Sequence, residues 1–164
     1  MKEITYEQAL QRLTAWCAKG EHSTGEAKDK LFKLGLHETE RQRVIDFLTD
    51  NGYIDDKRYA QAYIKDKLVF NGWGPKKIVQ GLRQKGIDSQ TCNAMISEID
   101  DAVFAEKLLP LMQKKVRTLS ADHQRDSLIR FAAQRGFTWQ QIDACLKQIQ
   151  LTQTDDETQW DLDA

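Results

Sequence analysis

Long apolar runs and cysteine pairs are both scarce in this sequence. No hydrophobic run approaches the length of a membrane span, and the opening residues, Met-Lys-Glu-Ile-Thr-Tyr, lack the apolar core of a signal peptide. We therefore expect a cytoplasmic protein. The three cysteines, Cys17, Cys92 and Cys145, lie far apart on apolar helical stripes, which argues against a disulfide framework or a zinc cluster and favours small core residues.

Catalytic motifs are also missing. The chain has no glycine-rich phosphate loop, no His-Glu-x-x-His, no Cys-x-x-Cys and no serine in a nucleophile elbow. Two pairs of adjacent carboxylates occur, Asp55-Asp56 and Asp100-Asp101, but consecutive side chains diverge by about 100° on a helix, and both pairs stand where N-caps are expected. We therefore expect neither an enzyme nor a metal site nor a cofactor.

Three glycines, by contrast, recur at a regular interval: Gly35, Gly86 and Gly136 are 51 and 50 residues apart. Such a period is typical of stacked helical units. Each glycine is expected to be the left-handed residue that ends one helix, and the apolar residue after it is expected to pack back on that helix. The apolar residues four positions before the glycines and one position after them are Leu31, Leu82, Ala132, Leu36, Ile87 and Phe137.

The repeat predicts an all-α fold of three tandem three-helix repeats, stacked into an elongated array. The expected boundaries are 1–52, 53–100 and 101–150, followed by a disordered acidic tail at 151–164 that has five acids and no Lys or Arg. Ser23 with Glu26, and Thr138 with Gln141, have the spacing of capping boxes. Pro110 is expected to kink or break its helix.

Positive charge is concentrated in the middle repeat, although the whole chain has a net charge of −1. Residues 57–86 contain eight Lys or Arg and one acid, Asp66. An ordinary solvated helix surface is the alternative to a binding surface, but such surfaces normally intersperse acids with bases. Lys76 and Arg83 fall on the outer side of the helix that Pro75 opens, and Arg58 and Lys65 line a flank of the helix before it, which suggests one positive strip.

Trp73, between two glycines, either inserts into a partner or packs beneath its own turn. With the basic residues it completes the set predicted to contact a partner or DNA. The eight candidates are Arg58, Lys65, Lys67, Trp73, Lys76, Lys77, Arg83 and Lys85.

Three stretches of the middle repeat, Gly52–Ala60, Gly72–Ile78 and Leu82–Ile87, resemble the RecX family of recombinase regulators in residues and spacing. The resemblance implies a curved array of three three-helix repeats that binds the RecA filament on single-stranded DNA. It further implies a monomeric regulator without catalysis, which mostly inhibits the filament's ATPase, strand-exchange and coprotease activities in homologous recombination, DNA repair and the SOS response. Lys67 and Lys77 stand where the family often has arginine. A lysine keeps the positive charge but cannot form the two parallel hydrogen bonds that a guanidinium makes to a carboxylate or phosphate.

Two other functions fit the same residues. A nonspecific DNA-binding helical module would neutralise phosphates with its basic side chains and stack a base on Trp73 without any recombinase. Because the basic region is confined to one repeat and the net charge is −1, we expect only weak direct DNA contact that is lost as salt rises. A helical adaptor for an unrelated acidic protein is the third possibility.

Overall fold

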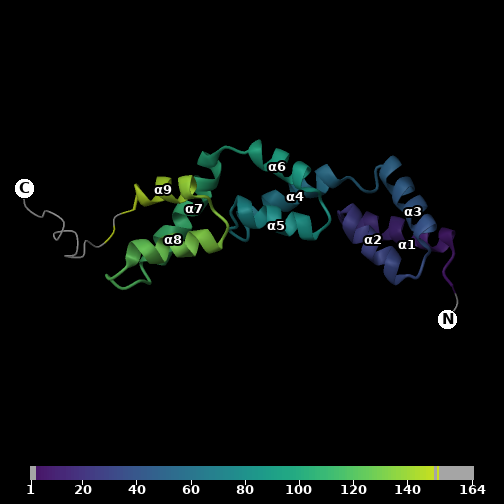
Figure 1. The fold of residues 1–164 in the computed structure, drawn as a ribbon, viewed down its shortest axis with the longest axis horizontal. Helices are drawn as coiled ribbons and strands as arrows, with labels where there is room; N and C mark the ends of the chain where they lie inside the picture. The colour runs from purple at the N-terminus through teal and green to yellow at the C-terminus, as the bar shows by residue number, and fades with distance from the viewer. Residues whose placement is uncertain (1–2, 150, 152–164) are drawn as a thin grey trace, which may run out of the picture. The chain divides into compact units, whose positions relative to one another are not determined.

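The computed structural model describes residues 3–149 and 151, and these residues form helices and turns without a strand. The fold is all-α, as the glycine repeat predicted (Figure 1). The predicted tail at 151–164 lies outside the described residues apart from Leu151. The nine helices of the described part are α1 (Tyr6–Lys19), α2 (Thr24–Lys33), α3 (Glu38–Asp50), α4 (Asp56–Val69), α5 (Pro75–Gln84), α6 (Ser89–Ser97), α7 (Asp101–Val116), α8 (Gln124–Gln134) and α9 (Trp139–Leu146).

Capping boxes begin α1, α2 and α9 in the part of the chain that the structure describes. Ser23 and Glu26 form one at the start of α2, and Thr138 and Gln141 form one at the start of α9, so both sequence predictions are confirmed. A third, made by Thr5 at the start of α1, was not predicted. Each box satisfies amide groups that the first helical turn leaves without a partner.

The three repeated glycines all adopt the left-handed conformation, with φ of +83°, +83° and +90° at Gly35, Gly86 and Gly136. At the second glycine the Ile87 amide donates to the Leu82 carbonyl at 3.1 Å, which is the long bond of a Schellman motif. The apolar residues four positions before the glycines, Leu31, Leu82 and Ala132, are completely buried.

Pro110 does not break its helix, since α7 continues through it from Asp101 to Val116. The predicted break is therefore wrong, whereas the predicted kink stays a prediction. The ring lies on the exposed side of α7, where losing one backbone hydrogen bond is tolerated better than in a core. Pro75 is the first residue of α5, as predicted, where its missing N–H costs no helical bond.

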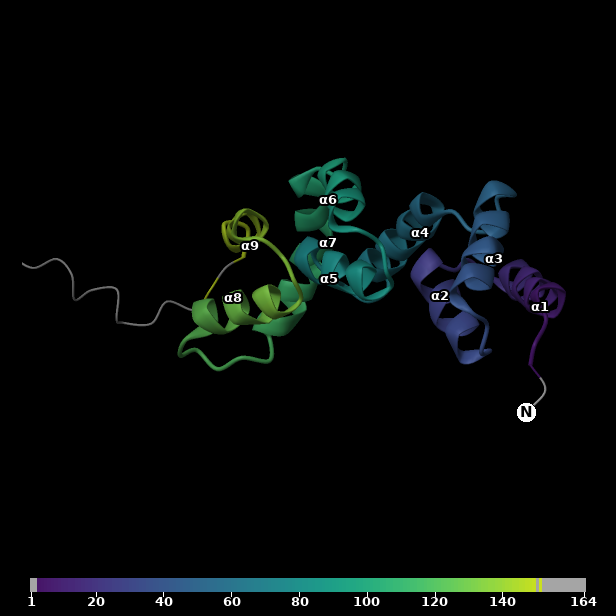
Figure 2. The ribbon, with the colours of Figure 1, turned by 45° about the vertical axis from the view of Figure 1, so that its right-hand side comes forward.

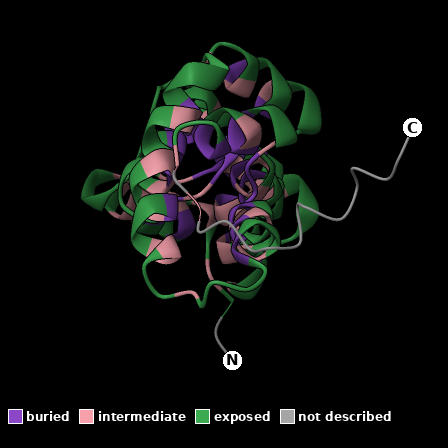
Figure 3. Cartoon of the chain, turned by 90° about the vertical axis from the view of Figure 1, so that its left-hand side faces the viewer, coloured by how far each residue is buried: buried purple, intermediate pink, exposed green. Residues whose placement is uncertain are grey.

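The structure consists of two compact units, Met1–Lys65 with Val79–Ser97, and Asp66–Ile78 with Glu98–Ala164. The division passes through α4 and α5, so the predicted boundaries of the middle repeat stay a prediction. In the first unit α1, α2 and α3 enclose a core that includes Leu13, Leu31 and Leu48. In the second unit α7, α8 and α9 lie together (Figure 2), with residues such as Phe104 and Leu128 buried between them. Buried residues occupy the helix sides that face other helices (Figure 3).

Candidate partner-binding surface

The eight predicted residues are divided between the two units. Arg58, Lys65, Arg83 and Lys85 belong to the first unit, and Lys67, Trp73, Lys76 and Lys77 to the second. All eight are exposed or half-buried. That they form one continuous strip stays a prediction, and the two groups are described separately.

In the second unit two lysines converge on Trp73. The Lys67 and Lys77 ammonium nitrogens lie 5.0 and 4.7 Å from the centroid of the indole ring, within cation–π range. The Trp73 amide donates to the Lys67 carbonyl at 3.0 Å, which fixes the turn after α4. We call Lys67, Trp73 and Lys77 the Trp73 cluster. Because the ring is half-buried, the cluster presents positive charge around an aromatic surface that is partly open to solvent.

Lys76, beside this cluster, has its backbone fixed and its side chain exposed. Its amide donates to the Gly136 carbonyl at 2.9 Å, and the Gly74 amide donates to the Arg135 carbonyl at 2.7 Å. A Cβ on Gly74 would overlap backbone atoms of Gly136 and Phe137, so only glycine fits there. These contacts, which we call the second joint, dock the start of α5 on the turn between α8 and α9.

In the first unit two of the predicted cations, Arg58 and Lys85, already pair with acids. These acids lie just before α2 and in its first turn. The Arg58 Nε donates to the Glu21 carboxylate at 2.8 Å, and Nη2 donates to the Gly52 carbonyl at 3.1 Å. The Lys85 ammonium lies 4.0 Å from the Glu26 carboxylate. These acids lie outside the 57–86 segment, so the charge count of that segment alone overstates its positive potential.

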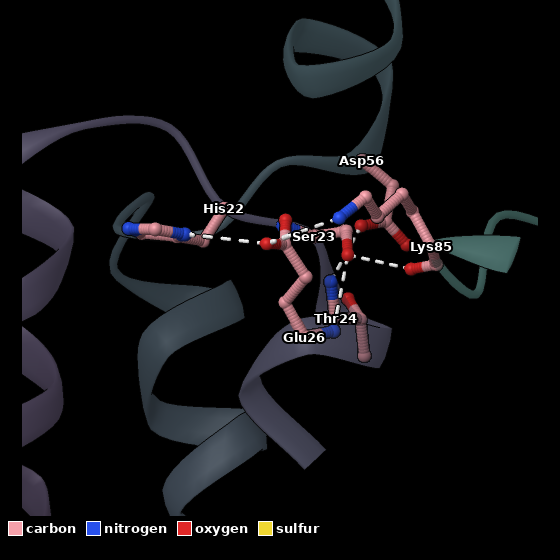
Figure 4. Close-up of polar contacts among 6 residues, drawn as sticks. All are labelled: His22, Ser23, Thr24, Glu26, Asp56 and Lys85. Atoms are coloured by element: carbon pink, nitrogen blue, oxygen red, sulfur yellow. Dashed lines mark hydrogen bonds and ion pairs between the residues drawn. The ribbon is translucent and has the colours of Figure 1, made fainter. Parts of the chain in front are cut away.

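A polar network that includes Glu26 and Lys85 forms the first joint, which brings together the starts of α2 and α4 and the turn after α5 (Figure 4). The buried Ser23 hydroxyl donates to the Lys85 carbonyl at 2.6 Å and accepts from the Glu26 amide at 3.1 Å. The Thr24 amide donates to the Asp56 carboxylate at 2.8 Å. A Cβ on Gly25 would overlap the Lys85 carbonyl oxygen, so the two backbones are in direct contact.

The first joint also changes the ionisation of a neighbouring tyrosine. Burial is the main cause that raises the pKa of Tyr59, and the charge of Glu26 with a hydrogen bond to it raises the pKa further. Nearby, Tyr63 fills the space over Gly81, where a Cβ would overlap its hydroxyl. The close contact at this glycine, in the middle of α5, is therefore made by a side chain.

Of the acids that the sequence placed at helix starts, Asp55 and Asp56 have structural roles, whereas the Asp100 side chain makes no cap hydrogen bond. Asp55 accepts from the Arg58 amide at 3.1 Å as a helix cap, and Asp56 accepts from Thr24 at the first joint. All three cysteines are free, and burial raises the pKa of each thiol. Within residues 3–149 and 151 no group of three or more His, Cys, Asp or Glu is placed to hold a metal ion, and no helix is long and apolar enough to span a bilayer.

Comparison with known proteins points to one family. The family model described as "RecX, second three-helix domain" matches residues 55–95. The "Regulatory protein RecX" of Vibrio parahaemolyticus is 31% identical over 143 residues, which are 85% of this chain and 88% of that protein. The protein of the same name from Pelodictyon phaeoclathratiforme is 29% identical over 136 residues, 83% of this chain and 85% of that protein.

Other relatives are longer, and a solved structure supports the fold. A "Regulatory protein RecX" of Clostridium botulinum is 32% identical over 128 residues, yet the match spans only 59% of that protein. The crystal structure of RecX from Lactobacillus salivarius superimposes with a TM-score of 0.81 over 87% of this chain and 95% of that one, at 24% identity. At that identity the likeness bears on the fold alone.

Proposed function

This chain belongs to the RecX family of regulatory proteins, and we propose that it binds the RecA filament on single-stranded DNA and mostly inhibits the filament's ATPase, strand-exchange and coprotease activities. The observation that carries the proposal is the likeness to regulatory proteins of this family over most of the chain. The proposal assigns the chain no catalysis of its own, a monomeric form, a cytoplasmic location and at most weak direct contact with DNA.

Exposed cations supply the contact in this proposal. Lys76 and Arg83 are exposed on α5, and among the described residues neither takes part in an ion pair. Arg58 and Lys85 contribute less, because a partner's acid or phosphate must first displace Glu21 or Glu26. Positive side chains of this kind meet acidic protein surface or phosphate, and they accelerate association at low salt.

The joints give the proposed mechanism its rigidity. Backbone-to-backbone contact at Gly74 and Gly25 leaves little room for adjustment within each unit. Helical repeats held this firmly are suited to contact neighbouring subunits of a polymer and to oppose the rearrangement that ATP turnover requires. Inhibition then follows from binding to the assembled filament.

A RecA ATPase assay on single-stranded DNA, run beside a DNA-only binding assay, tests the proposal. Inhibition is expected at concentrations well below those that bind DNA. The variant carrying Lys76→Glu and Arg83→Glu is expected to inhibit about tenfold less well, because two attractive contacts become repulsive. A double variant with the same charge change at exposed Lys33 and Lys107 serves as the matched control. Unchanged inhibition by the folded Lys76/Arg83 variant would show that these residues are not the contact.

A nonspecific DNA-binding module acting without RecA is the second candidate, and the Trp73 cluster is the observation that favours it. An aromatic ring flanked by two ammonium groups is the arrangement that single-strand binding platforms use. This alternative predicts that the chain binds an oligonucleotide as tightly without RecA as with it. It also predicts a steep loss of affinity with salt, whereas a mainly protein-protein contact depends on salt less.

A further inference from the structure

Two exposed apolar residues at the C-terminal end of α4 lie next in sequence to the Trp73 cluster, in the second unit. Phe70, directly after the end of α4, is 80% exposed, and Val69 is 47% exposed. Phe70 lies within the turn that the bond from the Trp73 amide to the Lys67 carbonyl closes. We call the six residues Lys67, Val69, Phe70, Trp73, Lys76 and Lys77 the Phe70 patch. They fall within Asp66–Ile78, which is part of a single unit.

The Phe70 patch combines an exposed aromatic side chain with positive charge, and both are features of interaction surfaces. A large aromatic side chain in water is a good anchor for binding, because its burial releases more free energy than that of most side chains. The segment 66–78 that carries Phe70 contains three lysines and one acid, Asp66. Among the described residues neither Lys76 nor Lys77 is in an ion pair, so their charge is available to a ligand. The chemistry fits an acidic peptide that also carries apolar side chains.

The sequence of this chain contains such a peptide. Residues 152–164 carry five acids and no Lys or Arg, and Trp160 and Leu162 alternate with acids at their end. We propose that the acidic segment 152–164 binds the Phe70 patch of its own chain. Trp160 and Leu162 then cover Phe70 and Val69, and the carboxylates meet the lysines. The five acids are Asp155, Asp156, Glu157, Asp161 and Asp163.

The connection between segment and patch makes this contact feasible. Leu151 and the patch belong to the same unit. Trp160 stands nine residues after Leu151 and reaches about 30 Å when the chain is extended, which equals the diameter of a compact unit of this size, about 30 Å. Tethering of this kind gives an effective concentration on the order of millimolar, so a contact that is weak between separate molecules is well populated within one.

The contact regulates the proposed function. The acidic segment covers Lys67, Lys76 and Lys77, which are three of the cations assigned to the filament contact. The segment therefore competes with the filament and lowers the apparent affinity of the chain for it. This regulatory consequence rests on the proposed function, whereas the binding of segment to patch does not.

The test uses the full chain, without recombinase. In a neutralised variant the four Asp and the one Glu of the segment become amides: Asp155→Asn, Asp156→Asn, Glu157→Gln, Asp161→Asn and Asp163→Asn. A fluorescein-labelled peptide of residues 152–164 is titrated with this variant and with the wild-type chain at low salt, and its anisotropy is measured. The peptide is expected to bind the neutralised variant about tenfold more tightly, because in the wild-type chain the tethered segment competes.

Two aromatic substitutions locate the contact. Phe70→Ala in the neutralised variant is expected to weaken peptide binding about tenfold, because the apolar anchor is lost. Phe32→Ala is the matched control, since Phe32 is 70% exposed but lies in the other unit, and it is expected to leave binding unchanged.

Five results would overturn the proposal. The first three are equal peptide affinity for the wild-type chain and the neutralised variant, no effect of Phe70→Ala, and an equal effect of Phe32→Ala. The fourth is a single-stranded oligonucleotide that binds both chains equally and loses affinity with Phe70→Ala, because the patch would then be an open nucleic-acid surface. A dimer formed by the wild-type chain but not by the neutralised variant would place the segment on a second copy, which contradicts the contact within one chain. These measurements do not involve RecA, so they succeed or fail independently of the proposed function.

Discussion

Ser23→Ala is expected to destabilise the chain through two separate contacts. The Ser23 hydroxyl accepts from the Glu26 amide at the start of α2, and it donates to the Lys85 carbonyl across the first joint. Alanine removes both. Loss of an N-cap costs about 1 kcal/mol. Loss of the second bond, at a position with no solvent access, costs about 1 kcal/mol more. The free energy of unfolding should therefore fall by about 2 kcal/mol.

Thr5→Ala provides the matched control for this prediction. Thr5 forms the same capping box with Gln8, but this box is exposed, and among the described residues its hydroxyl bonds only within the box. Its loss should cost only about 1 kcal/mol. Both variants are unfolded with urea under the same conditions, and the change in the free energy of unfolding is compared. Equal losses for Ser23→Ala and Thr5→Ala would refute the argument that the Ser23 hydroxyl holds the first joint.

Two further predictions concern the second joint and pH. Gly74→Ala should lower the free energy of unfolding by about 2–4 kcal/mol, because the new Cβ overlaps the Gly136 and Phe137 backbone. Gly20→Ala is the control: a Cβ there meets no atom within 4 Å, so it should change the free energy of unfolding by less than about 0.5 kcal/mol in the same thermal melts. A similar loss for both would contradict the close contact. Folding raises the pKa of Tyr59 above 10, which is its pKa in the unfolded chain. The contribution of Tyr59 to stability is therefore fully present below pH 10 and is lost as the pH rises toward the pKa in the folded chain. Tyr59→Phe should therefore flatten the alkaline part of the stability curve measured by denaturant titration, and an unchanged slope would contradict this assignment.

The fold was largely predictable because the same local signals occur more than once. Gly86 and Gly136 end helices in the left-handed conformation, and Ser23 and Thr138 begin them with capping boxes, all of which follow from residue type and short spacing. At Pro110 the local rule predicted a kink or a break, and the break does not occur, because packing of α7 in its unit outweighs the cost of one missing hydrogen bond.

The candidate surface was harder to predict, because its charges and contacts depend on residues distant in sequence. Glu21 pairs with Arg58 across 37 positions, so counting charge in one segment missed it. Phe70 was missed for another reason: a lone aromatic between an apolar helix end and a glycine turn gives no sign of being exposed. The convergence of Lys67 and Lys77 on Trp73 likewise depends on how the turn closes, which spacing alone does not give.

Direct binding of the labelled chain to preassembled RecA filaments tests the central claim. The same oligonucleotide without RecA is the comparison, and both are titrated at physiological ionic strength with anisotropy as the readout. The chain is expected to bind the filament at least about tenfold more tightly than the bare oligonucleotide, because protein contacts add to weak phosphate contacts. Equal affinity for filament and bare oligonucleotide would contradict the assignment of the filament as partner.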